Sequence, residues 1–256
     1  MHVVAIIQAR MSSTRLPGKV LMPLAGRPVL AHVVERVRHC ERVDDVVVAT
    51  STDASDDALE AWCREAGVAC WRGSLHDVLD RYHQAAQAHR ADAIVRITAD
   101  CPALDPAIVD EVVDAFVAGG YDFCSLAGEF PDGLDCSVFA ASAIARAHRE
   151  ARLPSEREHV GPYIENHPEW FKLGAVRKFT GLAHHRWTLD EPRDYEFLQA
   201  VFGRLYRDGA APFGAADVLA LLEREPQLTA LNADITRNAG YLKSLQADKQ
   251  QDHAQP

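Results

Sequence analysis

The sequence predicts one α/β domain with a mainly parallel central sheet. Short apolar runs alternate with amphipathic segments through the first half of the chain, which is the pattern of a βαβ series. The chain has 256 residues and 48% hydrophobic content, enough to bury one large core. After Tyr121 the rhythm changes, which we interpret as a small lobe inserted at about residues 125–180 of a domain that spans 1–245.

Three buried strands are predicted in the first half, each a continuous apolar run bounded by polar turns: Val3–Ile7, Val46–Ala49 and Ala93–Ile97. Such runs are typical of parallel strands that are covered on both faces. A further strand is predicted over His185–Leu189, and we expect it to return to the main sheet.

Helices are predicted between and after these strands, from apolar residues at helical spacing and from start signals. Asp105 before Pro106 reads as an N-cap followed by a first-turn proline, and Glu191 before Pro192 has the same arrangement. The expected helices follow Pro28, Pro106 and Pro192, and cover 140–151, 158–166 and 213–241 with an interruption at Pro226. The Asp132-Gly133 pair signals a turn, and the polar segment 246–256 is predicted to be a disordered tail.

Composition narrows the class of protein. A formal net charge of −10 argues against a general nucleic-acid binder, because phosphate backbones demand a basic surface. No segment approaches the roughly 18 apolar residues that a membrane span needs, and the N-terminus lacks a basic leader. We therefore expect a cytoplasmic protein with no nucleic-acid or membrane partner. The six cysteines have no C-x-x-C spacing, so no zinc site or disulfide framework is indicated.

The segment from Gln8 to Lys19, directly after the first strand, combines small residues with two arginines and a lysine. Residues 1–34 contain no acidic side chain to neutralise these cations. Ligands bind at the carboxyl ends of parallel strands, where backbone N–H groups and cations can hold a triphosphate. A solvated basic turn is the alternative, and the segment matches neither the G-x-x-x-x-G-K-[ST] nor the G-x-G-x-x-G loop. The pattern favours a nucleotide-phosphate site of another type.

Two aspartates, Asp100 and Asp190, follow predicted strands and so are expected beside this loop. Magnesium binds a few carboxylate oxygens and takes its other ligands from water and phosphates, so two aspartates suffice. The alternative is that both cap the following helices, but Asp105 and Glu191 lie nearer to those helix starts. Asp194 is expected in the first turn of its helix, where a carboxylate is stabilised by the dipole, and we assign it a structural role.

The ordered motifs resemble a known family. The stretch Ala9 to Leu21 fits A-R-x-x-S-x-R-L-P-G-K-x-L, the signature of bacterial cytidylyltransferases that activate acidic sugars, and is most similar to the spore-coat-polysaccharide type. The likeness covers roughly residues 3 to 205. It continues through Ala49–Asp53, Arg72-Gly73, Val78–Tyr82, Arg96–Pro102, Gly133–Asp135, Arg157–Val160 and Arg186–Pro192, and Asn238–Tyr241 also fits.

The resemblance implies a Rossmann-like, GT-A-like nucleotidyltransferase fold, a homodimer, and Mg²⁺-dependent transfer of CMP from CTP to an acidic acceptor. It implies catalytic roles for Arg10, Arg15, Lys19 and Asp100, and metal binding by Asp100 and Asp190. Nucleotide contacts are expected from Gln8, Ala9, Arg10, Ser12, Ser13, Arg15, Lys19, Ser51, Arg72 and Arg96. Acceptor contacts are expected from Asp135, Arg157, His159 and Arg186, with Glu158 a further candidate.

The sequence departs from the family pattern at one position. The pattern G-L-D-x-E appears here as Gly133-Leu134-Asp135-Cys136-Ser137, so a serine stands where a carboxylate is usual. This change is consistent with an altered acceptor, a weakened activity or an inconsequential substitution. Two other functions therefore stay open: a sugar-1-phosphate nucleotidyltransferase that uses another nucleotide, and a non-catalytic nucleotide-binding protein.

Overall fold

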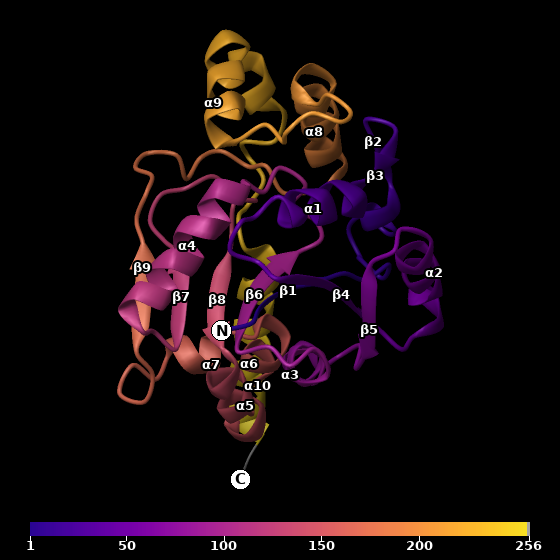
Figure 1. The fold of residues 1–256 in the computed structure, drawn as a ribbon. Coiled ribbons are helices and arrows are strands. Elements are labelled where there is room, and N and C mark those ends of the chain that lie inside the picture. The colour runs from indigo at the N-terminus through magenta and orange to yellow at the C-terminus, as the bar shows by residue number, and fades with distance from the viewer. Residues whose placement is uncertain (255–256) are drawn as a thin grey trace.

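A seven-stranded sheet runs through the centre of the protein in this computed structural model, which describes residues 1–254 (Figure 1). Its order is β5-β4-β1-β6-β8-β7-β9, and every neighbouring pair is parallel except the two that involve β8. The strands are β1 (Val3–Gln8), β4 (Asp45–Ser51), β5 (Ala69–Gly73), β6 (Ala93–Thr98), β7 (Phe123–Leu126), β8 (Ser137–Ala140) and β9 (Leu173–Val176). A separate hairpin joins β2 (Pro23–Leu24) to β3 (Arg27–Pro28). The predicted strands at β1, β4 and β6 and the mainly parallel sheet are confirmed.

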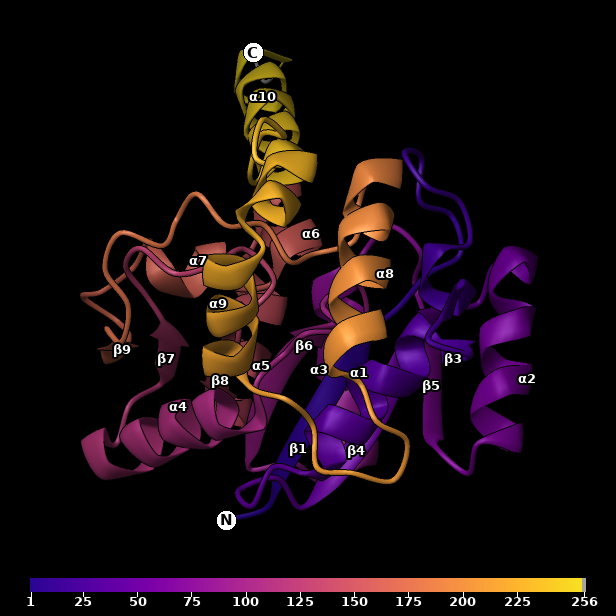
Figure 2. The same ribbon diagram turned by 90° about the horizontal axis from the view of Figure 1, so that it is seen from above.

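Helices cover both faces of the sheet and create two cores (Figures 1 and 2). One core lies under α1 (Val29–Arg38), α2 (Asp57–Glu65), α4 (Pro106–Gly119), α8 (Pro192–Leu205) and α9 (Ala215–Arg224). The other lies under α3 (Val78–Ala88), α5 (Ala141–Glu150), α6 (Pro154–His159) and α7 (Pro162–Glu165). Short 3₁₀ turns are η1 (Lys19–Leu21), η2 (Ala54–Asp56) and η3 (Pro226–Leu231), and α10 (Ala239–Ala254) packs on α6.

The helix starts that the sequence signals are present. Asp105 Oδ1 accepts a hydrogen bond from Ala107 N at 3.0 Å, so it caps α4 ahead of Pro106. The helix expected over 158–166 is instead two short helices, because Val160 and Gly161 separate α6 from α7 and Val160 has a positive φ of 70°.

Strands β7, β8 and β9 pair within the main sheet. The inserted lobe at about 125–180 stays a prediction. The second half of the chain differs from the prediction in two respects. His185–Leu189 does not form a strand. Its backbone hydrogen-bonds to loop residues Asp132 and Asp100, and its one bridge is an isolated pair between Arg186 and Asp132. The segment expected as a disordered tail is helical through Ala254, because α10 is held against α6 by hydrogen bonds from its inner face.

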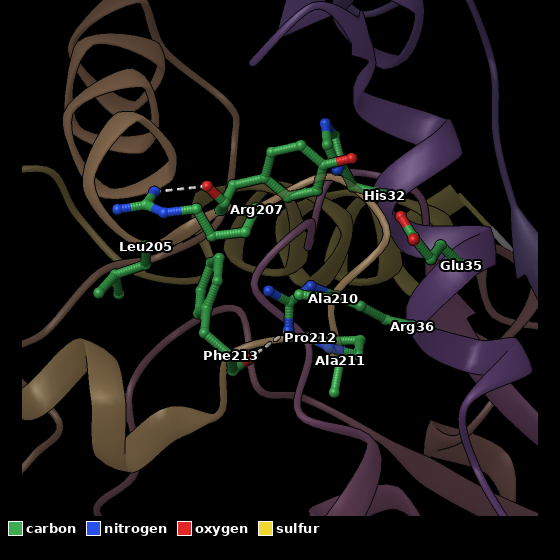
Figure 3. Close-up of a pocket in the computed structure, with 10 residues that line it drawn as sticks. His32, Glu35, Arg36, Leu205, Arg207, Ala210, Ala211, Pro212 and Phe213 are labelled. Carbon is green, nitrogen blue, oxygen red and sulfur yellow. Dashed lines mark hydrogen bonds between the residues drawn. The ribbon is translucent and has the colours of Figure 1, made fainter.

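A buried arginine anchors the loop between α8 and α9 to α1 (Figure 3). The Arg36 guanidinium donates to the carbonyl oxygens of Leu104 at 2.8 Å and Phe213 at 2.7 Å, and lies 4.1 Å from the Phe213 ring centroid. Burial lowers the pKa of Arg36 to about 10. No helix within residues 1–254 has the length and apolar character needed to cross a bilayer.

Candidate active site

The loop after β1 is closed by its own backbone. Gly18 N donates to Met11 O at 2.9 Å, and Gly18 takes a left-handed conformation with φ 72°, which a side chain would disfavour. Asp56 fixes the start of the loop, because its Oδ1 accepts from Met11 N at 2.7 Å. The 3₁₀ turn η1 follows and carries Lys19 inward, where only 7% of the residue is exposed.

Backbone contacts bring two distant segments to the end of β6. Leu189 N donates to Asp100 O at 2.8 Å, and Thr188 Oγ1 bonds the same oxygen at 3.3 Å. Gly133 lies against this segment: a Cβ atom on it would be 2.6 Å from the carbonyl carbon of Trp187. The absence of a side chain at Gly133 therefore permits the close packing that places Asp190 beside Asp100.

Lys19 joins the two aspartates. Its Nζ lies 2.6 Å from Asp100 Oδ2 and 2.8 Å from Asp190 Oδ1. Burial opposes ionisation of Asp100, but the Lys19 ammonium outweighs it and lowers the Asp100 pKa to about 2. Burial likewise opposes the charge on Lys19, and the two carboxylates raise its pKa above the usual value. Lys19 and Asp100 are therefore both charged at neutral pH.

Asp190 is surrounded by cations. Its Oδ1 also accepts from Arg15, 2.9 Å away, and its Oδ2 accepts from Arg186 at 3.1 Å. Arg15 further contacts Glu191 at 3.3 Å, and its side chain is partly exposed. The structure thus brings together Arg15, Lys19, Asp100 and Asp190, which the sequence predicts as one site.

The other loop residues lie around this cluster. Arg10 is exposed and pairs with Glu158 of α6 at 3.5 Å, and Ser13 Oγ accepts from Leu16 N at 3.4 Å. Ser12 is exposed, and Ala9 is buried at the end of the strand. Gln8 Oε1 is a buried acceptor without a hydrogen-bond partner in the described part of the chain, so a ligand donor could satisfy it.

Two predicted nucleotide contacts are occupied by bonds within the protein. The Ser51 hydroxyl is fully buried and donates to Asp56 Oδ2 at 2.5 Å. Arg72 is bonded to Ser51 O, to Asp53 O, and to the surface carboxylates of Asp57 and Glu60. Their side chains hold the ends of β4 and β5 in place. Asp56, which ties β4 to the loop after β1, carried no sequence signal.

Two arginines predicted to contact the acceptor are also occupied. Arg186 is 5% exposed and donates to Asp132, Asp190 and Asp194. It therefore fixes the orientation of the Asp190 carboxylate through Oδ2, the oxygen that Lys19 does not contact. Arg157 binds Asp77, the N-cap residue of α3, and donates to His148 O at 2.8 Å. Asp132 and Asp77 lie 54 and 80 residues from their arginines along the chain, so no local pattern pairs them.

The remaining predicted residues are less constrained. The Asp135 side chain is 44% exposed and accepts from Gly133 N at 3.0 Å. Burial lowers the pKa of His159 to about 4, and its Nε2 lies 3.0 Å from Ser244 Oγ of α10. Arg96 lies on β6 and its Nε is buried without a hydrogen-bond partner among residues 1–254.

Asp194 has the structural role predicted for it. It is fully buried and accepts from Arg186, from Asn232 at 2.9 Å, and from the backbone N–H groups of Asp190 and Glu191 at 2.9 Å each. The pocket of Figure 3 and a second hollow of about 470 Å³ against Trp62 include none of the predicted site residues. The Lys19 cluster is thus the place where the chemistry-bearing groups converge.

Comparison with known proteins identifies the family. A family model described as cytidylyltransferase matches residues 4–228. The chain belongs to this family. The cytidylyltransferase is 36% identical over 230 residues to the spore coat polysaccharide biosynthesis protein SpsF of Bacillus subtilis, covering 86% of this chain and 94% of SpsF. It is 33% identical over 202 residues to a 3-deoxy-manno-octulosonate cytidylyltransferase of Anaeromyxobacter dehalogenans, covering 72% and 79%.

A solved structure agrees with this assignment. The structure of a cytidylyltransferase from Leptospira borgpetersenii is similar at a TM-score of 0.84 with 33% identity, covering 93% of this chain and 99% of that one. The predicted enzyme class, a nucleotidyltransferase related to polysaccharide biosynthesis proteins, is therefore confirmed for this cytidylyltransferase.

Proposed function

We propose that the enzyme transfers CMP from CTP to an acidic sugar of the ulosonic or nonulosonic acid type, or to a similar acceptor, and releases pyrophosphate. One observation carries this proposal: the Lys19 ammonium contacts both Asp100 and Asp190, so the cationic loop after β1 and two carboxylates from distant segments share one site. The family membership and the relative that uses 3-deoxy-manno-octulosonate support the nucleotide and the acceptor class.

The donor set at this site fits Mg²⁺. Among residues 1–250, whose side chains the structure describes, there is no group of three or more His, Cys, Asp or Glu suited to hold a metal. Magnesium, however, takes most of its ligands from water and phosphates. Asp100 and Asp190 would hold the ion through their carboxylate oxygens, which already lie 2.6 and 2.8 Å from the Lys19 ammonium. When bound, Mg²⁺ screens the phosphate charge and lowers the pKa of the acceptor hydroxyl.

The cations of the loop provide charge neutralisation. Arg10, Arg15 and Lys19 would bind the β- and γ-phosphates and stabilise the pyrophosphate as it leaves. Gln8 and Ala9 line the start of the loop, and Ser12 and Ser13 allow close approach of the backbone. The acceptor hydroxyl then attacks the α-phosphorus in line, and positioning supplies much of the rate.

Thermal unfolding with the four nucleoside triphosphates and Mg²⁺ tests the nucleotide. We expect CTP to raise the melting temperature most, since a ligand that binds only the folded state stabilises it in proportion to the logarithm of its concentration over Kd. A larger shift with UTP, GTP or ATP would favour a sugar-1-phosphate nucleotidyltransferase instead.

Pyrophosphate release with a panel of 2-keto acid sugars tests the reaction. We expect release with at least one acid in the presence of CTP and Mg²⁺, and none after EDTA is added. Binding of CTP without release across the whole panel would indicate a nucleotide-binding protein that lacks the transfer activity.

A further inference from the structure

We propose that Arg96 recognises the carboxylate of the acceptor, and that Ser137 makes this possible by leaving the guanidinium without an internal partner. The inference rests on the proposed function, because it concerns the acceptor side of the same site. It replaces the sequence-based expectation that Arg96 contacts the nucleotide.

Arg96 lies on the sheet face opposite the Lys19 turn. Side chains alternate along β6, so Val95 and Ile97 enter the core under α1 and α4, whereas Ile94 enters the core under α3 and α5. Arg96 therefore points to the α3 and α5 face. The 3₁₀ turn that carries Lys19 packs into the first core through Val20. The two cationic groups thus approach the carboxyl end of the sheet from different sides.

The guanidinium of Arg96 is half-buried and unsatisfied. Its Nε is shielded from solvent and has no hydrogen-bond partner, and no ion pair of this side chain occurs within the described residues. Burying a cation without a partner is costly, so an arginine that stays in such a place is suited to receive an anion from outside.

Two serines lie in register with Arg96 on one side of it, across β8 and β7. Ser137 of β8 is its register partner, and Ser125 of β7 is the partner of Ser137. Paired residues of neighbouring strands face the same side, with their Cβ atoms about 5 Å apart. A glutamate at 137, as in the family pattern, would lie within reach of Arg96 and neutralise it. Serine leaves the positive charge free and adds a hydrogen-bond donor.

Helix α6 connects this place to the phosphate loop. Glu158 pairs with Arg10 of the loop, and the next residue, His159, is close enough to Arg96 and Arg10 for both charges to add to the burial that lowers its pKa. His159 is neutral at pH 7 and packs against the Tyr241 ring of α10 at 5.0 Å between centroids. An acceptor held at Arg96 would therefore lie beside the triphosphate.

The surroundings favour a carboxylate. A planar carboxylate can accept two parallel hydrogen bonds from a guanidinium and further ones from the serine hydroxyls. Glu165, at the end of α7, is within electrostatic reach of Arg96, but it makes no hydrogen bond or ion pair with Arg96 in the described part of the chain. The site thus presents a guanidinium with no directly bonded counter-ion to a ligand.

The test measures binding of a 2-keto acid by calorimetry to protein that is saturated with CTP and Ca²⁺, which we choose to avoid turnover. The probes are pyruvate, 3-deoxy-manno-octulosonate, and the methyl ester of the latter as its uncharged counterpart. We expect the wild type to bind at least one of the two acids and not the ester. Ser137→Glu and Arg96→Met should each weaken acid binding at least tenfold and leave the Kd for CTP within twofold.

Two variants serve as matched controls. Ser137→Ala removes the hydroxyl without adding charge and should change acid binding less than threefold, and Arg96→Lys should retain part of it. The proposal is overturned if Ser137→Glu binds the acid like the wild type, if the CTP-loaded wild type binds neither acid, or if Arg96→Met loses CTP affinity instead. Failure of the wild type to bind CTP would contradict the proposed function itself, and the CTP titration detects that separately.

Discussion

Asp190 and Asp194 are four residues apart and have different environments. Asp190 is partly exposed and contacts Lys19 and Arg15, which belong to the loop that we propose binds phosphates. Asp194 is fully buried, and all of its contacts are with the protein. The structure therefore shows that the Asp190 carboxylate can contact a ligand and that the Asp194 carboxylate stabilises the fold. The sequence shows both only as aspartates in one short segment.

Exchanging Asp100 and, separately, Asp194 for asparagine should separate activity from stability. We expect Asp100→Asn to lower kcat at least a hundredfold with little change in unfolding, since Lys19 keeps Asp190 as a partner. Asp194→Asn should lower the free energy of unfolding by about 3 kcal/mol, because it weakens a buried pair with Arg186. Pyrophosphate release and urea denaturation measure the two effects. Normal activity of Asp100→Asn would remove its proposed metal role.

Lys19→Met should weaken CTP binding at least tenfold, because the ammonium that neutralises the phosphates is lost while the length of the side chain is kept. Calorimetric titration with CTP and Mg²⁺ measures this. Lys172→Met is the matched control: this lysine bonds Gly119 O at the surface and should leave the Kd unchanged. Equal affinities for the wild type and Lys19→Met would place the triphosphate elsewhere.

At the scale of elements, α6 depends on a distant helix for its first turn. Leu153, which precedes α6, has no polar side chain to cap it. Glu156 Oε2 accepts from the backbone N–H groups of Arg152 and Leu153, and Asp248 Oδ1 of α10 accepts from Ser155 N at 2.9 Å. The last helix thus supplies the missing capping group.

Asp248→Ala should lower the free energy of unfolding by about 1 kcal/mol, the usual cost of losing a helix cap. Lys249→Ala, a neighbouring change at an exposed position, should have a much smaller effect. Urea denaturation of both variants provides the comparison. If the two variants are equally stable, the contact between α10 and α6 contributes nothing measurable.

The sequence predicts elements well where the signal is local. The apolar runs of β1, β4 and β6 and the Asp105-Pro106 start of α4 are properties of a few adjacent residues. The antiparallel insertion of β8 depends on pairing with strands more than ten and more than forty residues away, which no local pattern encodes. His185–Leu189 has the apolar character of a strand, but its hydrogen bonds go to loops at Asp132 and Asp100.

The same reasoning explains the outcome for the site. Lys19 and Asp100 converge because β1 and β6 are parallel neighbours, and the carboxyl ends of such strands meet at one edge of the sheet. Asp190 joins them although residues 185–189 form no strand, because Leu189 N donates to Asp100 O. The ligand contacts predicted for Arg72, Arg157 and Arg186 stay predictions. In the structure these arginines are bound by carboxylates that carry no motif, namely Asp57, Glu60, Asp77, Asp132 and Asp194. Sequence alone shows a charge and not which neighbour neutralises it.

For the whole molecule, stability should fall in mild acid. Burial lowers the pKa of both His159 and His185 from 6.5 to about 4, so between these values the folded state binds fewer protons than the unfolded chain. The free energy of unfolding therefore decreases as pH falls from 6.5 towards 4. Asp132 acts in the opposite sense, because burial raises its pKa from 3.8 to about 6, but it is one group against two.

His185→Gln should reduce this loss. The glutamine cannot gain a proton. As the pH is lowered from 7.5 to 4.5, the free energy of unfolding should therefore fall less for the variant than for the wild type, because any loss of packing is the same at both pH values. Urea denaturation across this range measures the difference. At pH 7.5, where both histidines are neutral, the comparison gives the packing effect alone. Parallel curves at the two pH values would show that His185 does not contribute.

The position of Lys19 between Asp100 and Asp190 gives the free protein a built-in counter-ion. Two carboxylates held this close would repel one another and loosen the segment around Thr188, but the ammonium cancels that repulsion. If the proposed ion is required for turnover, a chelating buffer should therefore abolish activity and leave the melting curve unchanged. Adding the ion back after dialysis against EDTA should then restore activity with no refolding step in between.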